Sequence, residues 1–218
     1  MYRYEEPIFR LRSSSYGSNY WVFHSRKLRR RVAVFSNLEY ENILTLEMNP
    51  DVEWYCEYPL ETTVYIGGKE SKVLFNAWVK YKDGTEEYQG VAYLCSSDDS
   101  KDHVKVACQS AWCLQNDVNF VFRNEKNIEI GPFYIRNISL LAARARRFTA
   151  CGLNADRIFL SFIQAKRHIC IGELEKMGCL EKYRALDYIS DLYYRGLVTL
   201  SNMNTDCISA DTEVISIG

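Results

Sequence analysis

The sequence predicts an α/β protein with a mixed β-sheet flanked by helices, followed by a small, mostly helical domain. Strand-like and helix-like runs alternate up to about residue 138, whereas helical spacing dominates after Ser139 until two short strand-like runs near the end. The 218 residues are 47% hydrophobic and 14% aromatic, enough for one large core or two smaller ones. We therefore assign residues 1–138 to the first domain, including a basic arm at 1–34, and residues 139–218 to the second.

Composition excludes several classes of protein. No apolar run reaches the roughly 18 residues that a membrane span needs, and the first ten residues lack the apolar core of a secretion signal. We therefore expect no membrane association and a cytoplasmic location. The eight cysteines form no CxxC pair and only three histidines accompany them, which favours buried reduced thiols over a zinc site or a disulfide framework.

The net charge of −1 conceals a strong segregation of charge. Residues 1–34 hold eight Lys or Arg against two Glu, and residues 35–100 hold four Lys against thirteen Asp or Glu. A basic arm beside an acidic body suits a protein that holds a phosphate backbone near a metal-binding cleft, although solvated faces produce the same pattern.

The first domain begins with two short strands, 20–24 and 32–35, joined by a basic connector. Ser36 has the character of an N-cap, and Glu39 three residues later completes a capping box. The helix that follows is expected to bury Leu38, Ile43 and Leu46 and to end before Pro50. Runs 52–59 and 62–66 are strand-like, and two glycines at 67–68 mark a turn.

A β-hairpin is the clearest local signal. Alternating apolar runs at 72–81 and 86–95 flank Asp83 and Gly84, a dipeptide typical of a two-residue hairpin turn. A helix over 101–116 and a strand over 119–123 complete the domain. The apolar residues of that helix recur at helical spacing, namely Val104, Ala107, Cys108, Ala111 and Leu114.

Four helices are predicted in the second domain, at 139–148, 154–165, 171–177 and 180–194, followed by two strands around a polar loop. Three short helices followed by such a hairpin describe a winged-helix module. In its last helix we expect Lys182, Arg184, Asp187 and Asp191 on the outer face.

Three segments carry a family resemblance: Arg31-Val-Ala-Val-Phe-Ser-Asn-Leu-Glu39, Leu44-Thr-Leu-Glu-Met-Asn-Pro-Asp-Val52 and Tyr55-Cys-Glu-Tyr-Pro59. Together they resemble the amino-terminal signature of the TnsA-type transposon endonucleases. The likeness covers about Arg29 to Leu200 and is looser from Ser139 onward. The resemblance implies a restriction-endonuclease-like domain, a carboxy-terminal winged helix, and DNA-strand cleavage at transposon ends.

The family holds its metals with a helix Glu, a strand Asp and a Glu-or-Gln, any residue, Lys triplet. Glu39 matches the helix Glu, but the strand Asp falls at Asn76. A two-residue turn at Asp83 and Gly84 would set Trp78 opposite Gln89 and Asn76 opposite Val91, so the triplet would be Gln89-Gly90-Val91. A one-residue bulge would move the triplet to 90–92 instead. Neither register supplies the lysine.

These residues carry too few carboxylates, and no lysine, for nuclease chemistry. Mg²⁺ needs several carboxylates to offset its dehydration, and Val91 cannot activate or orient a water. We therefore expect vestigial positions at Glu39, Asn76, Gln89 and Val91, no cofactor, and no enzymatic activity. Glu87 is a candidate displaced acid, in which case Mg²⁺ would be the cofactor. In the predicted register, Gly90 and Ala92 lie on the opposite face, toward the 101–116 helix.

Double-stranded DNA is the expected partner, contacted through a basic run of Arg26, Lys27, Arg29, Arg30 and Arg31, with help from Lys182 and Arg184. The resemblance also implies transposase or ATPase-type partner subunits. Three functions remain open: a non-enzymatic DNA-binding or assembly subunit of a transposition machinery, an active endonuclease with a displaced carboxylate, and a defence or regulatory protein that reuses the scaffold.

Overall fold

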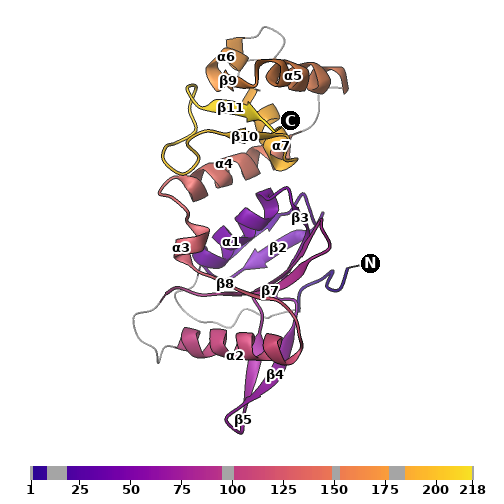
Figure 1. Cartoon of the computed structure of the whole chain (residues 1–218), viewed down its shortest axis with the longest axis vertical. Coiled ribbons are helices and arrows are strands. Elements are labelled where there is room, and N and C mark those ends of the chain that lie inside the picture. The colour runs from indigo at the N-terminus through magenta and orange to yellow at the C-terminus, as the bar shows by residue number, and fades with distance from the viewer. Residues whose placement is uncertain (1, 9–18, 95–100, 149–152, 177–184, 218) are drawn as a thin grey trace. The chain divides into compact units, whose positions relative to one another are not determined.

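The computed structural model describes residues 2–8, 19–94, 101–148, 153–176 and 185–217 (Figure 1). The chain divides into two compact units. The first comprises Met1–Leu46 and Asp51–Ile128, and the second comprises Glu47–Pro50 and Glu129–Gly218. The division falls at Ile128, ahead of the expected boundary at residue 138. No helix in the described ranges is long and apolar enough to cross a membrane.

The first unit has a mixed α/β fold, as predicted. Its elements are β1 (Trp21–His24), β2 (Arg31–Val34), α1 (Asn37–Met48), β3 (Val52–Glu57), β4 (Glu61–Ile66), β5 (Lys69–Leu74), β6 (Ala77–Tyr81), β7 (Glu86–Val91), α2 (Lys101–Gln115), β8 (Phe120–Arg123) and α3 (Glu125–Ile128). The central sheet has the order β3-β6-β7-β8, in which only the β7–β8 pair is parallel. Two separate hairpins, β1–β2 and β4–β5, accompany it.

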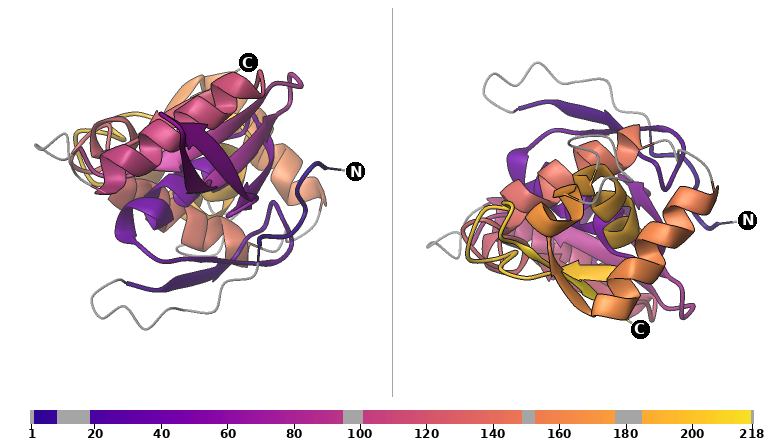
Figure 2. Two further views of the ribbon diagram at one scale, coloured as in Figure 1. Left: turned by 90° about the horizontal axis from the view of Figure 1, so that it is seen from below. Right: turned by 90° about the horizontal axis from the view of Figure 1, so that it is seen from above.

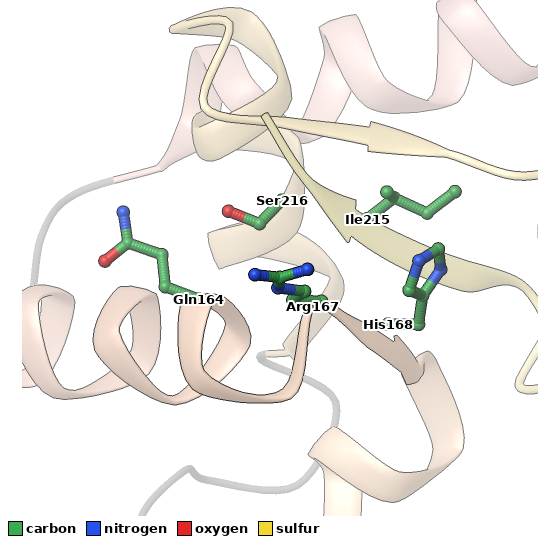
Figure 3. A pocket seen from close by; sticks show the side chains of 5 residues that line it. All are labelled: Gln164, Arg167, His168, Ile215 and Ser216. Atoms are coloured by element: carbon green, nitrogen blue, oxygen red, sulfur yellow. The ribbon is translucent and has the colours of Figure 1, made fainter. Parts of the chain in front are cut away.

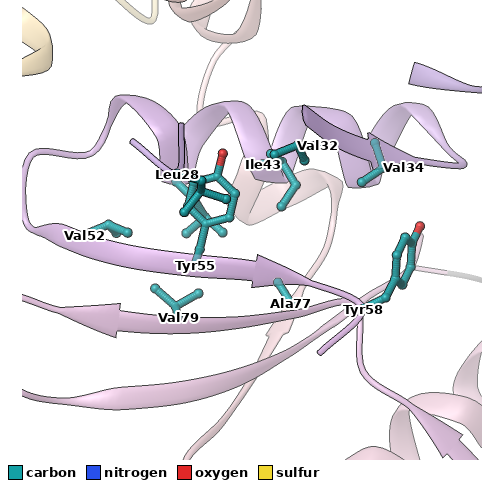
Figure 4. Packing of buried hydrophobic residues seen from close by; sticks show 10 residues of the cluster. Leu28, Val32, Val34, Ile43, Val52, Tyr55, Tyr58, Ala77 and Val79 are labelled. Carbon is teal, nitrogen blue, oxygen red and sulfur yellow. The ribbon is translucent and has the colours of Figure 1, made fainter. Parts of the chain in front are cut away.

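The two faces of this sheet pack against different elements. On one face, Tyr55, Ala77 and Val79 join Ile43 of α1 and Val32 of β2 in a buried cluster (Figure 4). On the other face, residues next to them in sequence, including Trp78, pack with Cys108 and Cys113 of α2. Adjacent strand residues point to opposite faces, so this alternation sandwiches the sheet between the two helices.

The α2 helix forms where it was predicted, but its buried face is not the apolar stripe read from the sequence. Cys108 is buried, whereas Val104 is 56% exposed and Leu114 is 84% exposed. The buried face instead includes Gln109 and Cys113. It packs against the sheet and the β4–β5 hairpin, beside which the helix runs in Figures 1 and 2.

The register of the β6–β7 hairpin predicted from a two-residue turn is wrong by one residue, and the pairing is that of the alternative with a one-residue bulge. Trp78 pairs with Tyr88, and Ala77 pairs with Gln89. The backbone N–H of Tyr81 donates to the carbonyl of Thr85, which closes a loop of three residues, 82–84, rather than two. Gly84 has φ +90, the left-handed conformation typical of the last position of a three-residue hairpin loop.

The second unit contains α4 (Tyr134–Arg147), α5 (Leu153–Lys166), β9 (His168–Cys170), α6 (Ile171–Lys176), α7 (Ala185–Tyr194), β10 (Val198–Leu200) and β11 (Glu213–Ser216). The three strands form an antiparallel sheet in the order β10-β11-β9. The short strand β9 was not predicted. It pairs with β11, far along the chain, and a partner at that distance leaves no local signal in three residues.

The outer face predicted for α7 is partly wrong, because α4 packs against this helix. Asp191, expected in solvent, is 5% exposed. Asp187 accepts a hydrogen bond from Arg144 of α4 at 2.7 Å. The other two predicted outer residues, Lys182 and Arg184, lie outside the described residues.

Candidate functional site

Glu39 is fixed at the start of α1 by its local sequence. Its backbone N–H donates to Ser36 Oγ at 3.1 Å, which is the capping interaction that the sequence predicts. The reciprocal bond of the predicted capping box is shifted by one residue, because the N–H of Phe35 and not that of Ser36 donates to Glu39 Oε2, at 3.1 Å. The Tyr58 hydroxyl donates to the same oxygen at 2.7 Å. One carboxylate oxygen thus serves the helix start, and the other is left to face the sheet.

Asn76 supplies the partner of that second oxygen. It lies between β5 and β6, outside regular pairing, and its Nδ2 donates to Glu39 Oε1. Its Oδ1 accepts from the backbone N–H of Val91 at 2.9 Å and from Gln109 Nε2 at 3.3 Å. A backbone N–H can only donate, so it fixes the orientation of the Asn76 amide. Asn76 therefore presents N–H to Glu39, not a lone pair.

A second chain of hydrogen bonds runs through Gln89. Arg123 Nε donates to Asn42 Oδ1 at 2.9 Å, and Asn42 Nδ2 donates to Gln89 Oε1 at 2.7 Å. Gln89 Nε2 in turn donates to Glu87 Oε1 at 2.6 Å. The chain starts at a guanidinium, which only donates, and ends at a carboxylate, which only accepts, so both amide orientations are determined.

Burial raises the pKa of Tyr81, as does the adjacent Glu87 carboxylate, to which the Tyr81 hydroxyl donates.

The structure thus brings Glu39, Asn76 and Gln89 to the α1 side of the sheet, although the register that suggested it was wrong. A Cβ on Gly90 would lie 2.1 Å from Gln109 Oε1 of α2, so Gly90 faces the opposite side, as predicted. The side chains meet despite the wrong register because Asn76 is not part of a regular strand. Its side chain therefore reaches the backbone N–H of Val91, although the two residues are not paired across the hairpin.

These residues do not fit a Mg²⁺ ion. Mg²⁺ requires oxygen lone pairs in near-octahedral geometry. Here Glu39 is bonded through both oxygens to protein donors, and the buried amides of Asn76 and Gln89 are committed at both ends. Within the described ranges, no three His, Cys, Asp or Glu side chains lie close enough together to hold a metal. The carboxylates and amides bond to one another and to the backbone, although Gln109 Oε1, which reaches the same group from α2, has no hydrogen-bond partner among the described residues.

Sequence reasoning missed four members of this network: Asn42, Tyr58, Gln109 and Arg123. Asn42 carried a signal, because it lies three residues after Glu39 and therefore on the same helix face. Arg123 reaches the network because β8 runs parallel to β7 and pairs Arg123 with Val91. That juxtaposition depends on tertiary structure alone.

The basic run divides into internal and exposed members. Lys27 Nζ donates to the carbonyls of Leu46 and Val52 at 3.0 and 2.7 Å. Arg30 forms a two-pronged ion pair with buried Glu57, with both N–O distances at 2.7 Å. Arg26 is half-buried, while Arg29 and Arg31 are exposed. Two of the five candidate DNA contacts are thus occupied inside the first unit.

Three of the five cysteines that the structure describes are buried, as expected, whereas Cys170 and Cys207 are half-buried. Cys56, Cys108 and Cys113 are buried and reduced, and burial raises the pKa of Cys56 and of Cys113 to about 12. Such thiols are protonated at neutral pH and are poor nucleophiles. Cys95, Cys151 and Cys179 lie outside the described residues.

No protein-family model matches this sequence, and no match is found among curated proteins.

Proposed function

We propose that this protein is a TnsA-like subunit in which a nuclease-type domain has become a binding and assembly module without catalytic activity. The single observation that carries the proposal is the hydrogen bond from Asn76 Nδ2 to Glu39 Oε1. It joins the two positions at which the resemblance places metal-binding carboxylates, and it puts an amide N–H where an acidic ligand would be needed.

The fold supports this proposal. A mixed sheet with α1 on one face and α2 on the other suits a restriction-endonuclease-like core. In the second unit, the order α5, β9, α6, α7, β10, β11 and the sheet β10-β11-β9 suit a winged-helix module. The helix in the position of a recognition helix, α7, packs against α4, so DNA contact through that face would be restricted.

Nicking of supercoiled plasmid in Mg²⁺ or Mn²⁺ is the direct test. We expect no nicking by the natural protein, because the network leaves no metal ligand set. The combined change Asn76→Asp, Gln89→Glu and Val91→Lys rebuilds the family's set on the same scaffold, and weak metal-dependent nicking by that variant would support a local loss of function. Nicking by the natural protein that disappears in Glu39→Ala would overturn the proposal.

An endonuclease with a displaced carboxylate is the second candidate. One observation favours it: Glu87 lies on the same face as Gln89 and is bonded to it. Glu87 and Glu39 belong to different chains of hydrogen bonds, however, and a shared metal would have to break both. Loss of nicking in Glu87→Gln, with Tyr81→Phe as the control, would promote this candidate.

For DNA binding, the exposed members of the basic run are the best candidates. Arg29 and Arg31 would neutralise up to two phosphates, so the log of affinity should fall against log salt with a slope of about −1 to −2. Replacing Arg29 and Arg31 together by alanine should reduce that slope. An unchanged slope would exclude the arm and favour a purely protein-docking role, with transposase or ATPase-type subunits as proposed partners.

A further inference from the structure

A cavity of about 470 Å³ opens on the second unit where α5 ends and β9 begins (Figure 3). Within the part of the chain that the structure describes, five residues line it: Gln164, Arg167, His168, Ile215 and Ser216. They come from a helix, the turn after it, and two paired strands. Among the described residues of the lining there is one permanent cation and no carboxylate. One acid, Glu213, lies 3.8 Å from His168 Nδ1 but is not among the described residues that line the cavity.

The backbone at Arg167 is unusual for its residue type. Arg167 has φ +63, a left-handed conformation that follows the last turn of α5, and its N–H donates to the carbonyl of Ile163 at 2.9 Å. Glycine or asparagine normally takes this position, because other side chains are disfavoured there. The carbonyl of Arg167 accepts from the N–H of Ser216 at 3.1 Å, which ties the turn to β11. The fold therefore holds a long cation at a place that favours glycine.

Two donors of this cavity lack partners among the residues that the structure describes. Ser216 Oγ is buried without a hydrogen bond. The Arg167 side chain is exposed and makes no ion pair with any described residue. In Figure 3 the Ser216 hydroxyl, the Arg167 guanidinium and the Gln164 amide lie around the same hollow. A buried hydroxyl without a partner is rare in folded proteins and calls for a partner from elsewhere.

We propose that this cavity binds a phosphate group. The guanidinium supplies charge and paired N–H donors, while the hydroxyl and the amide supply further donors from other directions. Donors from three separate elements suit a tetrahedral oxyanion better than a planar carboxylate. The site lies wholly in the second unit and does not depend on the state of the Glu39 network. The bound phosphate group would belong to a DNA backbone or to a small phosphate ester.

The test is titration of the full-length protein with inorganic phosphate, against chloride at equal ionic strength, followed by amide NMR shifts. Shifts are expected at Arg167, His168 and Ser216. Arg167→Gly should weaken phosphate binding about tenfold or more, since hydrogen bonds to charged groups are the strong ones. It also suits the left-handed backbone, so loss of binding would not reflect misfolding. Ser216→Ala should weaken binding by a smaller factor.

Lys166→Ala is the matched control, because it removes an exposed neighbouring charge that does not line the cavity. It should bind phosphate as the natural protein does, and an equal loss in this variant would overturn the site in favour of nonspecific attraction. Absence of binding at millimolar phosphate, or unchanged binding in Arg167→Gly, would also overturn it.

Displacement of phosphate by a short DNA duplex would identify the source as a DNA backbone, and displacement only by a nucleoside monophosphate would identify a small ester.

Discussion

Two polar sites, one in each unit, differ in how their side chains find hydrogen-bond partners. Between α1 and the central sheet, Asn76 bonds to Glu39 and to the backbone, and Gln89 bonds to Asn42 and Glu87, so these hydrogen bonds stay inside the protein. At the end of α5, Arg167 is exposed and Ser216 Oγ has no partner in the described part of the chain. The first arrangement stabilises a fold, while the second is available to a ligand.

Arg30 and Arg167 show the same difference between the two sites. Arg30 has only 14% of its side chain exposed and meets Glu57, whose side chain is 2% exposed, through two hydrogen bonds. Arg167 has the same chemistry but lies in solvent beside a cavity. The residue type therefore does not distinguish a structural cation from a binding one, and the surroundings decide.

The largest expected effect is that of Arg30→Ala. The change leaves the buried Glu57 carboxylate without its partner, which should lower the free energy of unfolding by about 3–5 kcal/mol. Urea denaturation at neutral pH measures this. Arg29→Ala, at the adjacent exposed position, is the control and should change stability by less than about 0.5 kcal/mol. Similar losses in both variants would show that Arg30 is no more structural than its neighbour.

Asn76→Asp should come next, with a loss of about 2–3 kcal/mol at pH 7, because two carboxylates would then face each other in a half-buried site. Glu39 raises the pKa of the introduced carboxyl in the folded state. The folded protein then holds a proton that the unfolded chain releases above about pH 4, so stability falls as the pH rises. Denaturation curves at several pH values measure the effect.

Asn76→Ala is the control for that prediction. It removes the same hydrogen bonds without adding a charge, so its cost should not grow between about pH 3 and pH 7 in this way. If Asn76→Asp showed the same flat dependence, the interpretation of the Glu39–Asn76 contact as a replacement for a metal site would be wrong.

A smaller loss is expected for Gly90→Ala, which tests how tightly the network is closed from the α2 side. The new methyl would meet Gln109 Oε1 at 2.1 Å and Phe120 Cζ at 3.0 Å. Gln109 is held by its bond to the carbonyl of Leu74, so we expect a cost of about 1–2 kcal/mol. Combining the change with Gln109→Ala should cost less than the sum of the two single changes, measured by a double-mutant cycle. Strict additivity would contradict the packing.

The sequence predicted those parts of the fold that depend on local chemistry. The Ser36 cap, the Gly84 hairpin and most helix positions follow from side-chain and backbone preferences of neighbouring residues. The hairpin register was missed because Asp-Gly is compatible with both two- and three-residue loops, and only the backbone of Gly84 distinguishes them.

The candidate site was only partly predictable for a related reason. Glu39, Asn76 and Gln89 were identified from the resemblance, but Arg123 and Gln109 enter through strand order and helix packing. The α2 face was misjudged because an apolar stripe does not guarantee burial, and Gln109 is buried by its hydrogen bonds to Leu74 and Asn76. Lys27 and Arg30 show the converse, since a basic run can also be internal structure.

The smallest of these effects is expected for Arg167→Gly, which should raise stability. A left-handed backbone disfavours arginine, and glycine relieves this cost while adding entropy to the unfolded chain, for a net gain of about 0.5–1 kcal/mol. Arg29 has φ +56 and is also exposed, so Arg29→Gly provides a reference gain at a position without a cavity. Thermal unfolding of both variants, without phosphate, measures the effect. Similar gains would mean that the Arg167 side chain contributes nothing to the fold and is free to bind a ligand, whereas a loss confined to Arg167→Gly would make it a structural residue after all, like Arg30.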